Sequence, residues 1–468
     1  MTKDQNYIEK KTDGLPIPKR YWAILAIALG VSVSVLDGTI ANVALPTIAQ
    51  DLNTSPTNVI WVVNAYQLAI TITLLSFSSL GDIFGYRKVY IFGLILFTCS
   101  SLACALSDSF VTLTLARVSQ GFGAAAITSV NTALLRIIYP KRYIGRGMGI
   151  NALVVAFSLA VGPTVASLIL AFAHWNWLFA INIPIGILAL YIAFRHLPYN
   201  PQKTGERKFD YLSSIANAVT FALLIFTLEG ITHEQQLHFI VMELIALLIV
   251  GFFFIRRQLK QKNPLLPVDL LRIPIFTLSI GTSICSFTAQ MLATVSLPFF
   301  FQNTLGYDSS EIGILLTPWP LAIIVVAPIA GRLVERVHAG ILGGIGLAIF
   351  AAGLLLLSFL PDNPTRLDII WRMVLCGAGF GLFQSPNNST IISSAPQHRS
   401  GGASGMLGTA RLLGQTLGAT LAAMMFTLVP ENSTQAALLL AGTFAIVAAV
   451  VSCLRLSQPS PTVLNSGK

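Results

Sequence analysis

Charged side chains interrupt several long apolar stretches of this sequence, and their chemistry is the most informative starting point. They are Asp37, Arg117, Glu243 and Arg411. A charge held away from water is costly unless it is paired or functional. A carboxylic acid out of water becomes easier to protonate, whereas a nearby arginine favours its ionised form. Because arginine itself stays charged, we expect Asp37 to carry a proton and Arg117 to tune it.

The two residues are predicted to lie at similar depths in two apolar helices. With a rise of about 1.5 Å per residue, Asp37 lies about 13 Å from the outer end of the helix at 21–45. Arg117 lies about 10 Å from the outer end of the helix at 111–137. If these helices are neighbours, the two side chains can form an ion pair. A purely structural pair is the alternative, but burying a pair only for stability often gains nothing.

The composition indicates what surrounds these charges. Of the 468 residues, 54% are hydrophobic and only 10% are charged, whereas a soluble domain carries roughly 25% charged residues. The net charge of +10 comes from basic residues in short gaps between apolar runs, which is typical of cytoplasmic membrane loops. The sequence therefore predicts an all-α integral membrane protein that binds no nucleic acid.

About fourteen segments are long and apolar enough to cross a bilayer as helices. They lie near 21–45, 57–80, 89–106, 111–137, 145–171, 176–195, 211–229, 237–255, 274–303, 310–331, 339–359, 370–394, 401–428 and 434–455. The first of these is too long for a signal peptide and lacks a cleavage site after it. We therefore expect it to stay in place as the first span.

Basic residues recur in every second loop, which predicts that both termini are cytoplasmic in a plasma (inner) membrane. The predicted inside positions are Lys3, Lys10, Lys11, Lys19, Arg20, Arg87, Lys88, Lys141, Arg142, Arg146, Lys203, Arg207, Lys208, Arg256, Arg257, Lys260, Lys262, Arg332, Arg336 and Arg399. The opposite loops carry mainly acids, with Arg366 and Arg372 as the basic exceptions.

The span count predicts two six-helix bundles around a central pair, a usual plan for secondary transporters. The expected parts are a cytoplasmic tail at 1–20, a bundle at 21–195, a linker with two extra transmembrane helices at 196–272, a second bundle at 273–456, and a cytoplasmic tail at 457–468. Because one chain carries both bundles, we expect it to function as a monomer.

Two further motifs predict moving parts. Gly162 and Pro163, in "AVGPTVAS", predict a kink or hinge at a helix interface, since proline removes a backbone hydrogen bond and glycine permits close packing. An ordinary helix kink is the alternative. The loop "GDIFGYRK" is predicted to lock an inside gate, although a plain basic loop would also explain its two basic residues. The gate residues are Asp82, Gly85, Arg87 and Lys88.

Several chemistries have no motif here. The sequence contains no G-x-x-x-x-G-K-[ST] loop, no H-E-x-x-H, no zinc-ligand spacing and no G-x-S-x-G. The five cysteines, at 99, 104, 285, 376 and 453, lie in apolar runs and form no C-x-x-C pair. We therefore expect no enzyme activity, no metal and no cofactor, and an ion gradient as the energy source.

At these motifs the chain resembles the major facilitator superfamily, specifically its fourteen-span drug:proton antiporter group. The matching stretches are "LDGTIANVALP", "GDIFGYRK", "LARVSQGFGAA", "AVGPTVAS", "NWLFAINIPIG" and "GYDSSEIGILLTPWP". The resemblance covers nearly the whole chain. The sequence departs from the family pattern at Ser78, Ala166 and Ser167, where the family usually has glycine.

The resemblance implies proton-coupled export of amphipathic, often cationic, drugs or biocides. A proton-coupled carrier for one specific metabolite is the alternative, and a non-transporting membrane protein is a third. Because Asp37 is the one acid predicted deep in the two bundles, a cationic substrate and a proton could compete for it.

A cavity for such compounds needs aromatic faces and adaptable polar side chains. The candidates are Trp61, Asn64, Tyr66, Gln67, Gln290, Met291, Trp319, Phe383, Gln384, Asn387 and Asn388. No role is assigned from the sequence to Glu229, Glu243 or Arg411.

Overall fold

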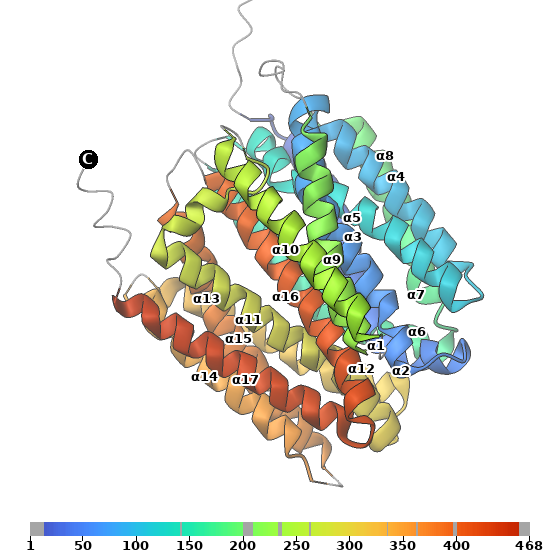
Figure 1. Cartoon of the computed structure of the whole chain (residues 1–468). Helices are drawn as coiled ribbons and strands as arrows, with labels where there is room; N and C mark the ends of the chain where they lie inside the picture. The colour runs from blue at the N-terminus through green and yellow to red at the C-terminus, as the bar shows by residue number, and fades with distance from the viewer. Residues whose placement is uncertain are drawn as a thin grey trace, which may run out of the picture.

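The computed structural model describes residues 14–140, 143–199, 209–232, 236–261, 264–334, 336–361, 364–395 and 400–457. Throughout these ranges the regular structure is helical (Figure 1). The helices of the first half are α1 (Lys19–Asp51), α2 (Pro56–Val59), α3 (Trp61–Phe84), α4 (Tyr86–Ala105), α5 (Phe110–Ile138), α6 (Ile144–Phe172), α7 (Trp177–Ala180) and α8 (Asn182–His196).

The central pair is α9 (Tyr211–Thr232) and α10 (Leu237–Lys260), and a short 3-10 helix at Val268–Arg272 leads into the second half. The helices of that half are α11 (Pro274–Phe299), α12 (Ser309–Leu316), α13 (Pro318–Leu333), α14 (Ala339–Ser358), α15 (Arg366–Ser394), α16 (Ser400–Leu428) and α17 (Ser433–Leu454).

Thirteen helical stretches of the described chain are long and apolar enough to cross a membrane. α16 has 29 residues and runs beside α11, α17 and α3, and it corresponds to the fourteenth predicted span. It falls outside the thirteen because polar residues interrupt it, including Arg411 and Gln415, which face a cavity. The predicted all-α architecture with about fourteen spans is therefore confirmed.

Side-chain caps explain where several helices begin. Ser109 and Thr112 form a capping box at the start of α5, and Thr365 and Asp368 form one at the start of α15. Each box satisfies backbone N–H groups that have no partner inside the helix. Short polar residues between apolar runs thus fix the helix starts.

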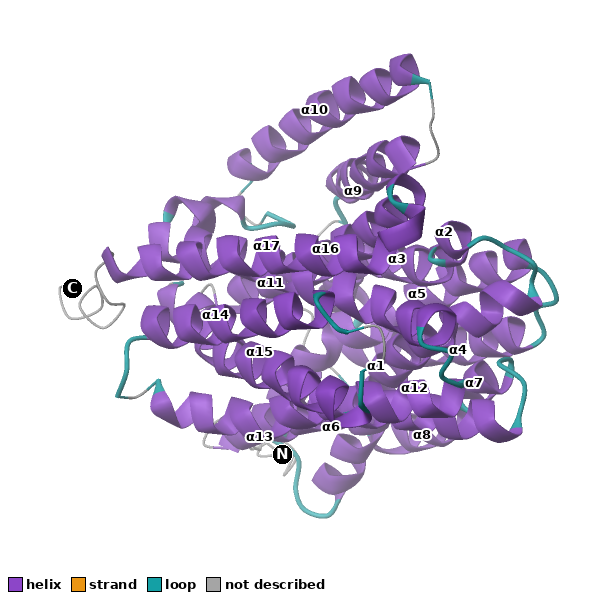
Figure 2. Ribbon diagram, turned by 90° about the horizontal axis from the view of Figure 1, so that it is seen from below, coloured by secondary structure: helices purple, strands orange, loops and turns teal. Residues whose placement is uncertain are grey.

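The first-half helices pack on one another, and so do those of the second half, while α9 lies along the seam against α3 and α16 (Figures 1 and 2). α10 packs on α9. α10 is the outermost helix, and only 6% of its most apolar stretch is buried. A helix this apolar and this exposed requires lipid around it.

Equivalent helix pairs in the two halves pack equally closely. A Cβ added to Gly123 of α5 would lie 2.6 Å from the backbone nitrogen of Phe97 in α4. A Cβ added to Gly379 of α15 would lie 2.4 Å from the backbone nitrogen of Phe350 in α14. Glycine permits this backbone approach in membrane helices, and it recurs at the corresponding helix pair of the second half.

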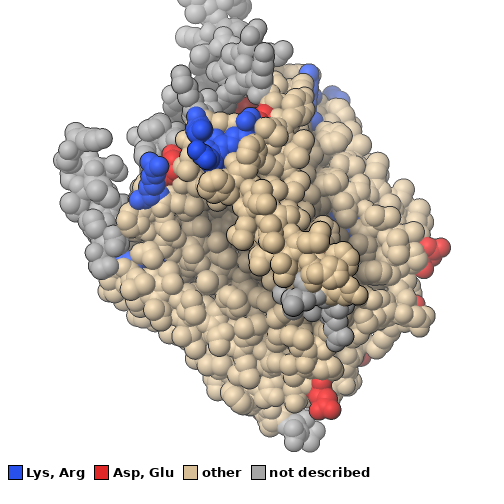
Figure 3. Space-filling view, viewed as in Figure 1, with Lys and Arg blue, Asp and Glu red and all other residues tan. Residues whose placement is uncertain are grey.

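The surface charges gather at opposite ends of the helices. Figure 3 shows Lys and Arg concentrated at one end, which we call the basic end; it includes Arg87, Lys88, Arg257 and Lys260, near the ends of α3 and α10. The other end, called the acidic end, carries Asp51, Asp108, Glu311 and Glu431 at or between its helix ends. Of the basic residues predicted inside, those at 3, 10, 11, 141, 142, 203, 207, 208, 262 and 399 lie outside the described residues, as does the side chain at 146.

Candidate functional site

A central cavity of about 1560 Å³ lies between the two halves. Side chains of α1, α3, α5 and α6 line it on one side, and side chains of α11, α13, α15 and α16 on the other. Its lining continues to the basic end, where Asp82, Arg136 and Asp210 stand at the mouth. Small-molecule sites typically occupy about 300–1,000 Å³, so the cavity has room for an organic molecule and water.

The acidic end is closed between the halves. The hydroxyl of Thr164 in α6 lies 2.8 Å from that of Thr317, between α12 and α13. Two more cross-half hydrogen bonds join Thr57 to Thr427, at 3.2 Å, and Gln302 to Gln50, at 3.2 Å. Buried apolar side chains from both halves form one continuous cluster around them. The cavity is therefore reached from the basic end.

Asp37, in the middle of α1, is the centre of a buried polar network. Its side chain is 1% exposed. One carboxylate oxygen, Oδ2, accepts a hydrogen bond from Nη1 of Arg117 in α5. The other, Oδ1, accepts from Nε2 of Gln120 at 2.9 Å and from Nδ2 of Asn182 at 2.7 Å. Three donors from α5 and α8 thus bind the carboxylate, and the predicted proximity of Asp37 and Arg117 is present.

Arg117 is also fully buried, at 0% exposure, and it makes further hydrogen bonds. Its Nε donates to the carbonyl oxygen of Val62 in α3 at 2.9 Å, and its Nη1 also donates to Oε1 of Gln120 at 2.6 Å. Its Nη2 has no hydrogen-bond partner within the described chain. The guanidinium therefore depends on Asp37 for charge compensation.

Tyr66 of α3 separates this network from the cavity. Its ring lies 4.1 Å from the guanidinium carbon of Arg117, and its hydroxyl donates to the carbonyl oxygen of Ser34 at 2.9 Å. Tyr66 lines the cavity, whereas Asp37 and Arg117 do not. In this conformation the acid lies directly behind the cavity wall, out of contact with anything bound there.

Gly162 and Pro163 lie where α6 meets both α1 and α12. A Cβ added to Gly162 would lie 2.0 Å from the hydroxyl oxygen of Thr39, two residues along from Asp37. A Cβ added to Gly313 of α12 would lie 2.3 Å from the carbonyl oxygen of Pro163. The motif therefore packs one half against the other, and its action as a hinge stays a prediction.

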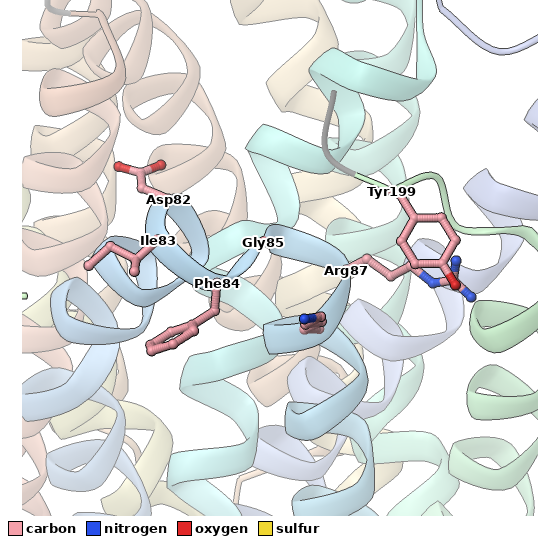
Figure 4. A pocket seen from close by; sticks show the side chains of 7 residues that line it. Asp82, Ile83, Phe84, Gly85, Arg87 and Tyr199 are labelled. Atoms are coloured by element: carbon pink, nitrogen blue, oxygen red, sulfur yellow. The ribbon is translucent and has the colours of Figure 1, made fainter. Parts of the chain in front are cut away.

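The four predicted gate residues line one small pocket between α3, α4 and Tyr199, but their side chains point in different directions (Figure 4). Gly85 has φ of 103° and joins α3 to α4, a conformation that favours glycine. Arg87 donates to the carbonyl oxygen of Phe194, and its guanidinium carbon lies 4.0 Å from the ring centre of Tyr199. Arg87 is therefore tied to the connection after α8 in its own half.

The side chain of Asp82 points away from that of Arg87 (Figure 4). It lines the mouth of the cavity, and Tyr86 donates to its Oδ1 at 2.6 Å. Lys88 lies with Arg87 at the start of α4. Because the basic end is open in this conformation, the gate itself is not formed here.

Six of the predicted cavity residues line the central cavity. They are Tyr66, Gln67, Gln290, Met291, Gln384 and Asn388. They come from α3, α11 and α15, so both halves contribute to the lining.

The structure corrects the other five cavity assignments. These five side chains do not line the cavity, because they pack between neighbouring helices. Trp61 stacks on Phe226 of α9 at 6.0 Å, and Asn64 donates to Thr420 at 3.3 Å. Trp319 and Phe383 belong to a chain of edge-on aromatic contacts that continues through Phe350 and Phe380. Helix rotation decides which face meets the cavity, and residue type does not reveal it.

The fifth, Asn387, is 0% exposed and binds a second buried arginine, Arg455. Its Oδ1 accepts from Nη1 of Arg455 at 2.7 Å, and its Nδ2 donates to Ser283 at 2.7 Å. Sequence reasoning did not single out Arg455, although its place at the end of the last apolar run was a usable signal.

Two members of the Asp37 network were also not predicted as site residues. Gln120 lies three residues after Arg117 and therefore on the same helix face, which was a usable signal. Asn182 lies in one of the family-like motifs. Of the residues left without a role, Arg411 lines the cavity and Glu243 lies on α10, while the side chain of Glu229 lies outside the described part.

Comparison with known proteins gives a consistent family assignment. The model of the Major Facilitator Superfamily matches residues 27–419 and, in a second match, 278–468. The chain is 62% identical to the uncharacterized transporter YebQ of Escherichia coli, over 96% of this chain and 98% of YebQ. It is 31% identical to the riboflavin transporter RibZ of Clostridioides difficile, over 86% of this chain and 87% of RibZ.

It is also 31% identical to the multidrug resistance protein Stp of Mycobacterium tuberculosis, over 84% of this chain and 74% of Stp. The crystal structure of a D-xylose-proton symporter matches its fold with a TM-score of 0.69 at 15% identity, covering 94% of this chain and 98% of that chain. This chain therefore belongs to the Major Facilitator Superfamily of transporters, with multidrug resistance proteins among its relatives.

Proposed function

We propose that this protein exports amphipathic small molecules in exchange for protons, by alternating access. The observation that carries the proposal is the Asp37 network, a fully buried acid behind the wall of a cavity that is open at one end. Of the groups that accept hydrogen bonds from Arg117, only the carboxyl group of Asp37 can gain or lose a proton. Buried ionisable groups in membrane helices commonly serve proton transfer.

The proton step follows from the hydrogen bonds. Ionised Asp37 accepts three hydrogen bonds, from Arg117, Gln120 and Asn182. Protonation replaces one acceptor site with an O–H donor and removes the charge that balances Arg117. The bonds that tie α1 to α5 and α8 then weaken, so α1 can shift relative to both helices. Proton loading at Asp37 is in this way coupled to the shape of the first half.

Alternating access requires the closed and open ends to exchange roles. The hydrogen bonds Thr57–Thr427 and Thr164–Thr317 break when the acidic end opens. Asp82, which stands at the cavity mouth, then closes against the second half. Because cytoplasmic loops carry most Lys and Arg, the basic end faces the cytoplasm, and this conformation is the one that takes substrate from the cell. One chain in the plasma membrane carries both halves of the pathway.

A second candidate is a proton-coupled carrier for one specific metabolite. Its support is the relative named as a riboflavin transporter, together with the many amide side chains in the cavity lining. Substrate breadth separates the two candidates.

The test is uptake of structurally unrelated fluorescent compounds into everted membrane vesicles, whose outer face is the cytoplasmic face, with and without a protonophore. Gradient-dependent movement of several compounds supports the exporter, and loss of that movement in Asp37→Asn supports the proton step. Movement of a single compound would favour the metabolite carrier. Normal pumping by Asp37→Asn would remove Asp37 from the mechanism.

A further inference from the structure

The central cavity contains a positive charge about halfway along the molecule. Arg411 is the twelfth of the 29 residues of α16, which places it about 17 Å along the helix from the basic end. It lines the cavity and is partly exposed there. Among the residues that the structure describes, no hydrogen bond or ion pair engages its guanidinium.

No carboxylate in the lining offsets this charge at the same depth. The other charged lining residues, Asp82, Arg136 and Asp210, stand at the mouth. Asp210 is already paired with Arg257 at 3.0 Å, and Asp82 accepts from Tyr86. Asp37 lies behind Tyr66 and is committed to three donors. Within the described lining, the deep part of the cavity therefore presents one cation and neutral groups.

The neutral groups suit an aromatic compound with polar substituents. Phe287 and Phe380 line the cavity with ring centres 5.4 Å apart, edge to face. Amides surround them: Asn42, Gln67, Gln290, Gln384, Asn388 and Gln415. Oδ1 of Asn42 and Oε1 of Gln67 are buried and have no hydrogen-bond partner in the described chain. Buried acceptors without partners are costly, so a ligand with N–H or O–H groups would satisfy them.

We infer that the transported compound is an amphipathic organic anion with an aromatic body, whose carboxylate or sulfonate binds Arg411. This inference rests on the proposed export function and replaces the cationic substrate that the family resemblance predicts. Arginine binds carboxylates through two parallel charge-assisted hydrogen bonds. An amphipathic cation would instead meet a like charge with no acid in reach, which disfavours its binding.

The charge of the substrate also decides how the membrane potential acts. Exchange of one inward proton for one outward cation moves no net charge. Exchange of one inward proton for one outward monoanion moves two charges in the same direction. Each charge changes the attainable concentration ratio by about fiftyfold per 100 mV. Export of the anion should therefore respond steeply to the membrane potential.

The experiment uses two dyes that share a xanthene ring system, fluorescein as the anion and rhodamine 123 as the cation. Binding to the purified full chain is measured by fluorescence anisotropy. We expect wild type to bind fluorescein more tightly than rhodamine 123. We expect Arg411→Gln to weaken fluorescein binding by about tenfold or more, and Arg411→Lys to restore part of it. Arg256→Gln is the matched control, because it removes one exposed positive charge from α10, outside the cavity.

Melting temperatures in detergent verify that each variant is folded. If wild type binds rhodamine 123 as tightly as fluorescein, the inference is overturned without reference to any variant. Equal fluorescein binding by Arg411→Gln and wild type overturns it as well. Transport of both dyes in vesicles separates this failure from failure of the proposed function: gradient-driven export of rhodamine 123 alone would preserve the exporter and reject the anion.

Discussion

Arg117 in the first half and Arg455 in the second are both completely buried, at 0% and 1% exposure, yet their surroundings differ in one respect. Arg117 is bound to a carboxylate, Asp37. Arg455 is bound to Asn387, Ser279 and Ser452, none of which can lose or gain a proton in the physiological range. The first-half network therefore contains an acid, whereas the second-half network contains none among the described residues.

In the proposed mechanism, this difference gives the two halves separate roles. Asp37, Gln120 and Asn182 link α1, α5 and α8 through bonds that depend on protonation. Arg455 and Asn387 link the end of α17 to α11 and α15 through bonds that do not. In the proposed exchange, protonation of Asp37 therefore acts on the first half.

The largest expected effect is that of Arg117→Gln. It leaves Asp37 buried without a counter-charge, and removing one partner of a buried pair typically costs about 3–5 kcal/mol. Alternatively, Asp37 stays protonated and proton exchange stops. We expect a lower melting temperature in detergent, or a normal one with transport abolished. Near wild-type melting together with near wild-type transport would contradict the role given to the pair.

Arg455→Met should lower stability less than Arg117→Gln does, and it should leave proton coupling intact. It leaves no uncompensated charge, but it leaves the Oδ1 of Asn387 without its partner, at a cost of about 1–3 kcal/mol. We expect a lower melting temperature with the pH profile of transport unchanged. The control is Asp37→Asn, which should alter that profile. A pH profile shifted by Arg455→Met would show that the second half also takes part in proton coupling.

The smallest expected effect concerns another acid–arginine pair, Asp210 with Arg257. Asp210 precedes α9 and lies outside the membrane-spanning segments. Burial alone would raise the pKa of Asp210, but hydrogen bonds from Ser213, Gln261 and Arg257 outweigh it and lower the pKa. A lowered pKa in the folded state means that the ionised acid stabilises the fold above the usual Asp value, and that this stability is lost only as the pH falls below about 4.

Asp210→Asn should therefore lower stability by on the order of 1 kcal/mol, since the pair is partly exposed. The loss should be the same at pH 5 and pH 8, as measured by thermal melting. A loss that differs between these two pH values would mean that Asp210 titrates between them, which contradicts its lowered pKa.

The sequence predicted the buried pair because helical rise alone places Asp37 and Arg117 at matching depths. It also predicted the helix count, since bilayer thickness sets helix length. It did not predict which face of each helix meets the cavity, because that depends on how the helices rotate and pack. Asn387 and Asn388 illustrate the point: these adjacent amides look equivalent in the sequence, but one binds Arg455 and the other lines the cavity.

The most direct test of the account is proton movement in proteoliposomes that contain a trapped pH-sensitive dye, after addition of a transported compound. We predict that wild type couples compound movement to proton movement, and that Asp37→Asn still exchanges labelled for unlabelled compound but moves no protons. Proton movement by Asp37→Asn at the wild-type rate would contradict the claim that Asp37 carries the proton.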